Sequence, residues 1–145
     1  MKSLTYSFDD ISFRFISTLT GVSDFNGEGL GTISIESLVN PTKILGSADG
    51  QVMTLKMPNT KARFKVTTPQ VSSLAKKLWN NLMLLSKANS TVWNTNQAWI
   101  RETGSGMEIM LTFVSYEKPP ELIFTSRGTF TEFTFVAESM NVLCL

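Results

Sequence analysis

The chain has 145 residues, of which 42% are hydrophobic and only 17% are charged. An average soluble domain carries roughly 25% charged residues. The length suits one domain with a substantial core, so we expect a single domain over residues 1–145. The net charge of +1 excludes a long-range positive field that would attract nucleic acid or an anionic membrane. A surface with few ions loses little solvation when it is buried, which favours a subunit that assembles with copies of itself over a low-charge monomer.

Two features of the sequence bear on its compartment. Residues 1–6 lead directly into a strand-like pattern and lack the apolar segment of a signal peptide. No apolar run approaches the length of a transmembrane helix, and the single cysteine, Cys144, excludes an internal disulfide. We therefore expect a protein made in the cytoplasm, with no membrane partner, even if it ends in a particle.

The first third of the chain predicts short strands around a glycine-rich loop. Apolar residues alternate through residues 4–8, and the phase flips at Asp9-Asp10 before alternation resumes over residues 11–15. Such a flip fits a bulge or a tight turn. The glycine-rich stretch 22–31 predicts a mobile loop, and alternation returns over residues 32–37.

A hairpin and a basic strand are predicted next. Strands at residues 43–45 and 52–57 flank Ser47-Ala48-Asp49-Gly50, in which Asp-Gly is a strong turn signal because glycine supplies a positive φ. Residues 61–67 alternate strictly. They place Ala62, Phe64 and Val66 on one face and Lys61, Arg63 and Lys65 on the other.

One helix is predicted, from an N-cap at Thr68 and a first helical residue at Pro69 to about Lys87. Its apolar stripe is Val71, Leu74, Ala75, Leu78, Leu82 and Leu85. Four further strands are predicted at residues 98–102, 108–116, 121–125 and 129–136. The fold class is therefore mainly β, an antiparallel β-sandwich or barrel of about eight strands with one flanking α-helix.

The residues offer no chemistry. Histidine is absent, which removes the commonest general base and zinc ligand, and the carboxylates show no paired spacing. Cys144 lies one residue from the end of the chain, where a precise active site is improbable. We predict no catalytic, cofactor-binding or metal-binding residue, and no enzyme.

Two other motifs have a functional and a structural interpretation. The Gly27–Gly31 segment lacks the Lys and Ser/Thr of a phosphate-binding loop and precedes a strand pattern, which favours a flexible loop. The basic row at Lys61, Arg63 and Lys65 has an aromatic neighbour, Phe64, as nucleic-acid sites do. Phe64 shares the inward phase, however, and a buried ring cannot stack on a base.

Several motifs in order resemble a family of phage structural proteins that form the tail tube of contractile-tailed phages. Residues 46–53, Gly-Ser-Ala-Asp-Gly-Gln-Val-Met, resemble its (G)-x-A-D-G-x-V-M stretch. The opening T-Y-S-F-D-D at residues 5–10 is similar to its Y-S-F-x-D start. Residues 113–122 resemble its A-K-x-P-D/E-L turn and residues 129–137 its final strand. The resemblance covers nearly the whole chain.

The resemblance implies a fold shared with other tail-tube proteins and with the type VI secretion tube. It also implies six copies in a ring whose inner strands join into one barrel, with rings stacked into a channel for DNA ejection. Tail sheath, baseplate and tape-measure proteins would be partners, and the protein would lie in the virion after assembly in the host cytoplasm. The lumen should be polar and neutral or acidic, with Lys61, Arg63 and Lys65 directed away from it.

Two segments are candidates for contacts between rings. The first is the predicted hairpin, with Lys43, Ser47, Ala48, Asp49, Gly50, Gln51 and Lys56. The second is the glycine-rich loop, with Asp24, Asn26 and Glu28. Other assignments remain open: a tube-initiating or distal baseplate protein of the same fold, the tube of a phage-derived bacteriocin, or a single-strand nucleic-acid-binding β-barrel.

Overall fold

The computed structural model describes residues 10–26, 31–57 and 60–144, and this part of the chain is mainly β. The predicted strand over residues 4–8 and the predicted strand end at Pro58-Asn59 lie outside the described residues. In chain order the elements are β1 (Ile11–Ser17), β2 (Gly21–Asn26), β3 (Thr32–Ser37), β4 (Thr42–Gly46), β5 (Val52–Lys56), β6 (Ala62–Pro69), α1 (Ser73–Lys87), a short 3-10 helix η2 (Ser90–Val92), β7 (Asn96–Glu102), β8 (Met107–Lys118) and β9 (Phe130–Cys144).

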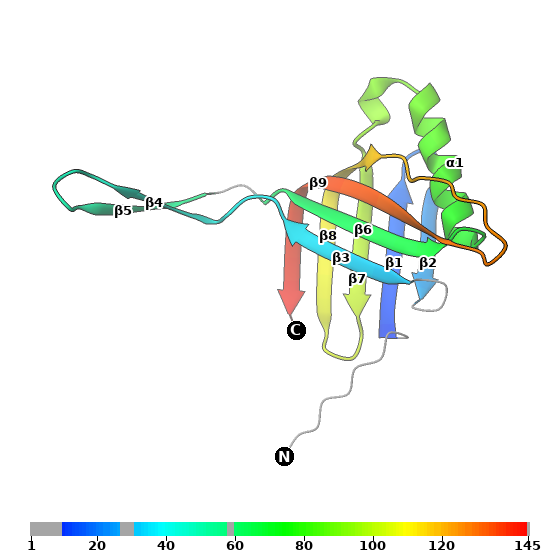
Figure 1. Ribbon diagram of the computed structural model, residues 1–145, viewed down its shortest axis with the longest axis horizontal. Helices are drawn as coiled ribbons and strands as arrows, with labels where there is room; N and C mark the ends of the chain where they lie inside the picture. Colours follow the sequence, from blue (N-terminus) through cyan, green and yellow to red (C-terminus); the bar gives the residue numbers. More distant parts are fainter. Residues whose placement is uncertain (1–9, 27–30, 58–59, 145) are drawn as a thin grey trace, which may run out of the picture.

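Seven strands form one antiparallel sheet in the order β2-β1-β7-β8-β9-β6-β3. The sheet bends at β9: Phe130–Ala137 pairs with β6 and Thr134–Cys144 pairs with β8, so only Thr134–Ala137 has a partner strand on both sides. The layer of β3 and β6 therefore crosses over the layer of β1, β7 and β8, and α1 lies at one end (Figure 1). Among the described strands the sheet is sandwich-like and does not close into a barrel, so β2 and β3 are its edges. The predicted fold class is confirmed.

Aromatic side chains from the two layers form the centre of the core. The Phe135 ring lies 4.7 Å from the Phe64 ring and 4.7 Å from the Tyr116 ring, centroid to centroid. Phe13 and Phe15 of β1 are buried beside them. The alternation predicted in β6 is confirmed, since Ala62, Phe64 and Val66 are all fully buried.

The helix begins later than predicted. Thr68 and Pro69 end β6, where they pair with Thr131 and Phe130 of β9. The N-cap is Ser72, whose hydroxyl accepts a hydrogen bond from the Ala75 amide at 3.2 Å. Pairing with β9 continues past Thr68, so the local helix-start signal there was wrong. The predicted end at Lys87 is confirmed, and so is the apolar stripe except for Val71, which lies before the helix and is 81% exposed.

Two other predicted elements were wrong. Residues 22–26, predicted as loop, belong to β2, which pairs with β1 from Gly21 to Asn26. Residues 121–125, predicted as a strand, form no strand and lie in the connection between β8 and β9. Strand β2 pairs with the strand just before it in the chain, a pairing that its sequence does not signal by alternation, whereas residues 121–125 have no strand partner among the described residues.

A buried polar network joins the helix to the sheet. The Asn81 side chain, 1% exposed, donates to Ser17 Oγ at 2.6 Å and to Thr20 Oγ1 at 3.0 Å. The Tyr116 hydroxyl lies 2.8 Å from Asn81 Oδ1 and 3.0 Å from the Leu78 carbonyl oxygen. These contacts fix the position of α1 relative to β1 and β8, because buried polar groups are costly unless paired.

Burial raises the pKa of the Tyr116 hydroxyl above its ordinary value of 10.0. Above pH 10 the unfolded chain releases this proton and the folded chain keeps it, so the free energy of unfolding falls as pH rises. The fall is about 1.4 kcal/mol per pH unit for this group. We expect Tyr116→Phe to be less stable than the wild type by about 1–3 kcal/mol at neutral pH. Urea unfolding from pH 8 to pH 11 should show that gap narrowing above pH 10; a constant gap would contradict the assignment.

Candidate assembly surfaces

Strands β4 and β5 form a separate two-stranded sheet that projects far from the rest of the molecule (Figure 1). We call residues 42–56 the arm. The arm is inserted between β3 and β6, which are antiparallel neighbours, and the Leu38 amide still donates to the Lys61 carbonyl oxygen at 3.0 Å. The arm is therefore a long insertion in the connection of one β-hairpin. The hairpin predicted from the Asp-Gly signal is confirmed.

The arm exposes large apolar side chains. Ile44 is 67% exposed, Val52 is 68% exposed and Met53 is 59% exposed. No arm residue belongs to the hydrophobic core. A two-stranded ribbon in water is at best marginally stable, and apolar surface of this kind marks a site of protein contact. The arm is thus suited to being covered by another surface.

Hydrogen bonds within the turn order the tip of the arm. The Ser47 amide donates to the Gln51 carbonyl oxygen at 2.9 Å, and Gly50 adopts a φ of +88° that favours glycine. The Asp49 carboxylate accepts from the Ser47 hydroxyl and, at 3.3 Å, from the Gln51 amide. These bonds, above all the one from Ser47, lower the pKa of the Asp49 carboxyl. The tip therefore presents a fixed negative charge.

The structure brings most of the predicted contact residues together. Lys43, Ser47, Ala48, Asp49, Gly50, Gln51 and Lys56 all lie in the arm. Asp24 and Asn26 lie in β2, at the other edge of the large sheet from β3, to which the arm is connected. Glu28 lies outside the described residues. The two predicted sets therefore do not form one surface, and their role in contacts between subunits stays a prediction.

A second apolar surface, not predicted from the sequence, lies where the β8–β9 connection meets the start of the helix. We call its exposed side chains the apolar patch: Val71, Ile123, Phe124 and Phe130. Phe124 is 85% exposed and Phe130 is 64% exposed. A hollow of about 320 Å³ lies among them, and Arg127 is part of its lining. The run Leu122-Ile123-Phe124 after Pro119-Pro120 is the available signal in the sequence, but its pattern predicts a strand.

Gln70 holds the apolar patch in place. Its side-chain oxygen accepts from the Ile123 amide at 3.4 Å and from the Thr129 hydroxyl at 3.0 Å. Its backbone amide donates to the Thr129 carbonyl oxygen at 3.0 Å. One residue thus ties both ends of the connection to the chain before α1.

We expect Gln70→Ala to loosen the β8–β9 connection, because the mutation removes both side-chain hydrogen bonds. Loss of about 1 kcal/mol of local stability raises the open population roughly fivefold. Limited trypsin cleavage after Arg127, followed by mass spectrometry, should accelerate by that factor. Gln97→Ala, at an exposed position on β7, is the control and should leave cleavage after Arg127 unchanged.

The basic row on β6 is compensated by carboxylates. Arg63 Nε lies 2.6 Å from Glu117 and Arg63 Nη1 lies 3.3 Å from Glu36. The Glu117 carboxylate raises the pKa of the Arg63 guanidinium. Lys65 Nζ is 4.0 Å from Glu132. Phe64 is fully buried, as predicted, so its ring is not available for stacking on a base.

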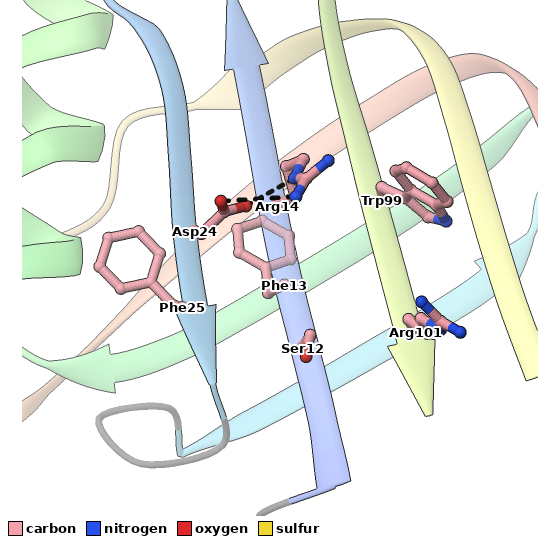
Figure 2. A pocket seen from close by; sticks show the side chains of 7 residues that line it. All are labelled: Ser12, Phe13, Arg14, Asp24, Phe25, Trp99 and Arg101. Carbon is pink, nitrogen blue, oxygen red and sulfur yellow. Dashed lines mark hydrogen bonds and ion pairs between the residues drawn. The ribbon is translucent and has the colours of Figure 1, made fainter. Parts of the chain in front are cut away.

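A shallow hollow of about 340 Å³ lies on the β2-β1-β7 side of the sheet (Figure 2). Arg14 Nε lies 2.6 Å from Asp24, and the Arg14 guanidinium carbon is 5.5 Å from the centre of the Trp99 ring. Arg101 pairs with Glu108 at 3.2 Å. The pairing balances the charge of Arg14 and Arg101 here, as it balances that of Arg63 on β6.

Metal and membrane sites are not found in the part of the chain that the structure describes. Over residues 10–26, 31–57 and 60–144, no three or more His, Cys, Asp or Glu side chains come close enough to hold a metal ion. Within the same ranges no helix has the length and apolar character needed to span a membrane. Cys144, at the end of β9, is exposed.

The family model of the bacteriophage PhiTE tail tube protein matches residues 3–144. No curated protein matches the sequence. Among solved structures, the anti-feeding prophage tube terminating cap is similar with a TM-score of 0.61 and 11% identity, over 100% of this chain and 94% of that one. The sheath/tube terminator of the extracellular contractile injection system PVC gives a TM-score of 0.62 and 10% identity, over 91% and 93%. A chain of the PVC sheath-tube complex gives a TM-score of 0.55 and 13% identity, over 92% of this chain and 88% of that one. At these identities the solved structures show a common fold.

Proposed function

This chain belongs to the PhiTE tail tube protein family, and from that premise we propose that it is a structural subunit of a bacteriophage tail tube. In this proposal six copies form a ring, and stacked rings form the channel through which DNA is ejected. The observation that carries the proposal is the arm, because a projecting ribbon with exposed Ile44, Val52 and Met53 requires another surface to cover it. The predicted membership in a tail-tube family is confirmed.

The two edges of the large sheet support assembly side by side. Within the described residues, β2 and β3 each pair with one strand only, so each leaves one row of backbone N–H and C=O groups unpaired. Edge strands of this kind accept a strand from a neighbouring molecule unless they are protected. In a closed ring, the β2 edge of one copy meets the β3 edge of the next and removes both edges.

The charge distribution supports passage of DNA without retention. Phosphates are held by clusters of uncompensated Lys and Arg, whose counterion release gives salt-dependent affinity. On the outer faces of the sheet, Arg14, Arg63 and Arg101 each pair with a carboxylate, so these three cations form no uncompensated cluster there; Arg127, beside the apolar patch, lies away from these faces. A tube built in this way needs sheath, baseplate and tape-measure proteins as partners, no cofactor and no catalytic residue. It lies in the virion, after assembly in the host cytoplasm.

Negative-stain electron microscopy of the purified protein at high concentration tests the proposal. We expect rings with sixfold symmetry and stacks of rings, formed either by the protein alone or on an added baseplate complex. A protein that stays monomeric at every concentration, with and without that complex, would show that it is not a tube subunit.

A second assignment is a protein that begins or ends a tube. The similarity to the fold of a tube terminating cap and of a sheath/tube terminator favours it. Single rings that never stack in the same micrographs would support this assignment, whereas long stacks support the tube subunit. The tube of a phage-derived bacteriocin would also form long stacks. A single-strand nucleic-acid-binding protein, in contrast, should retain oligonucleotides at low salt, and we expect no retention.

A further inference from the structure

We infer that the arm of one copy docks on the apolar patch of a second copy, with Asp49 beside Arg127. The inference rests on the proposed function, because it identifies the surface that receives the arm. It concerns two surfaces that are both present on every copy, so no other partner is required.

The two surfaces match in their apolar character. Both faces of the arm carry exposed apolar side chains near its tip, among them Leu45, Val52 and Met53. The patch offers Val71, Phe124 and Phe130 around a hollow of about 320 Å³. The Gln70 hydrogen bonds already order this surface, so docking would cost little further ordering of the receiving side.

Charge complementarity fixes the orientation. Asp49 is the anion at the tip, and its hydrogen bonds all lie within the turn. Arg127 lines the patch, and within the described part of the chain its side chain forms no hydrogen bond or ion pair. The other arginines of the described chain, Arg14, Arg63 and Arg101, are paired. Asp49 at the end of the apolar arm and Arg127 beside the apolar patch are therefore complementary in charge.

The position of the two surfaces requires the contact to be between copies. The arm and the β8–β9 connection, drawn in orange, lie at opposite ends of the long axis of the molecule (Figure 1). The arm of one copy therefore cannot reach its own patch. Contact between two different surfaces of the same chain is head-to-tail, so every bound copy offers one free arm and one free patch. Such a contact adds copies repeatedly, as a stack of rings requires.

Disulfide trapping tests the contact directly. In a Cys144→Ser background, Ala48→Cys at the arm tip is mixed with Thr125→Cys beside the patch; both positions are exposed. We expect mixed disulfides to form at least about tenfold faster than for the control pair Ala48→Cys with Lys76→Cys on the exposed side of α1, because docking raises the local concentration of the two thiols. Equal rates for the two pairs would overturn the inference.

Charge reversal tests the orientation in the same assay. Asp49→Arg or Arg127→Asp alone should lower the rate of mixed-disulfide formation to that of the control pair. The two changes together, Asp49→Arg on the protein with Ala48→Cys and Arg127→Asp on the protein with Thr125→Cys, should restore the faster rate. Lys76→Asp is the matched control and should have no effect. Trapped pairs without sixfold rings would support this contact and contradict the ring proposal. Rings with no trapping above the control would contradict this contact and leave the ring proposal standing.

Discussion

Replacing residues 39–60 with Asn-Gly is expected to abolish assembly while leaving the subunit folded. The change joins Leu38 to Lys61 through a two-residue turn, which suits two antiparallel strands that already pair up to this point. The hydrophobic core contains no residue of the arm, so its packing remains intact. We expect a melting temperature within about 4 °C of the wild type and no stacked rings by electron microscopy.

The control for this deletion keeps the arm and changes another exposed apolar residue. Met83→Ser, on the helix, should assemble as the wild type does, because Met83 is 45% exposed and lies in neither the arm nor the apolar patch. Stacked rings formed by the armless protein would show that the arm is not needed for assembly. Unfolding of the armless protein would instead show that the arm stabilises the subunit, against the burial pattern.

Phe135→Ala is expected to have the largest effect on stability. The Phe135 side chain is fully buried and its ring contacts those of Phe15, Phe64, Phe133 and Tyr116, so it joins the two layers of the sheet. Removing a buried phenylalanine ring costs about 3–5 kcal/mol, out of the roughly 5–15 kcal/mol that stabilise a typical domain. Urea unfolding followed by circular dichroism should show that loss, or a protein unfolded without denaturant.

The matched control is Phe124→Ala. It removes the same atoms from a ring that is 85% exposed, so the free energy of unfolding of the isolated subunit should change by less than about 0.5 kcal/mol. A large loss from Phe124→Ala, or a small one from Phe135→Ala, would contradict the arrangement of the core. The same Phe124 variant should weaken docking of the arm, which separates the stability effect from the assembly effect.

The local sequence pattern correctly predicted the elements whose structure depends mainly on their own residues. The period of two in β6 and the Asp-Gly turn of the arm each specify their structure without reference to distant residues. The helix stripe from Leu74 to Leu85 is likewise a local repeat. The local signal failed where pairing with a distant strand determines the structure. At Thr68, for example, pairing of β6 with β9 takes the place of the predicted helix start.

Of the two proposed contact surfaces, one could be predicted from local sequence and the other could not. The arm was predictable because a turn signal between two short strands specifies a hairpin, although its projection from the body was not. The apolar patch was not predictable, because Leu122-Ile123-Phe124 has the composition of a buried strand and only the absence of a strand partner exposes it. The buried Asn81 was also missed, since a polar residue beside the apolar stripe gives no sign of its partners Ser17 and Tyr116.

Strand β9 is one continuous backbone that belongs to both layers of the sheet, with β6 along Phe130–Ala137 and β8 along Thr134–Cys144. Tension applied to the arm enters the body through the β3–β6 layer. It therefore reaches the β8 layer through the backbone hydrogen bonds that β9 forms with β6 and with β8, and not only through side chains packed across the interior. The subunit can thus transmit tension between its two layers through continuous backbone pairing, a property that two packed sheets with no shared strand would lack.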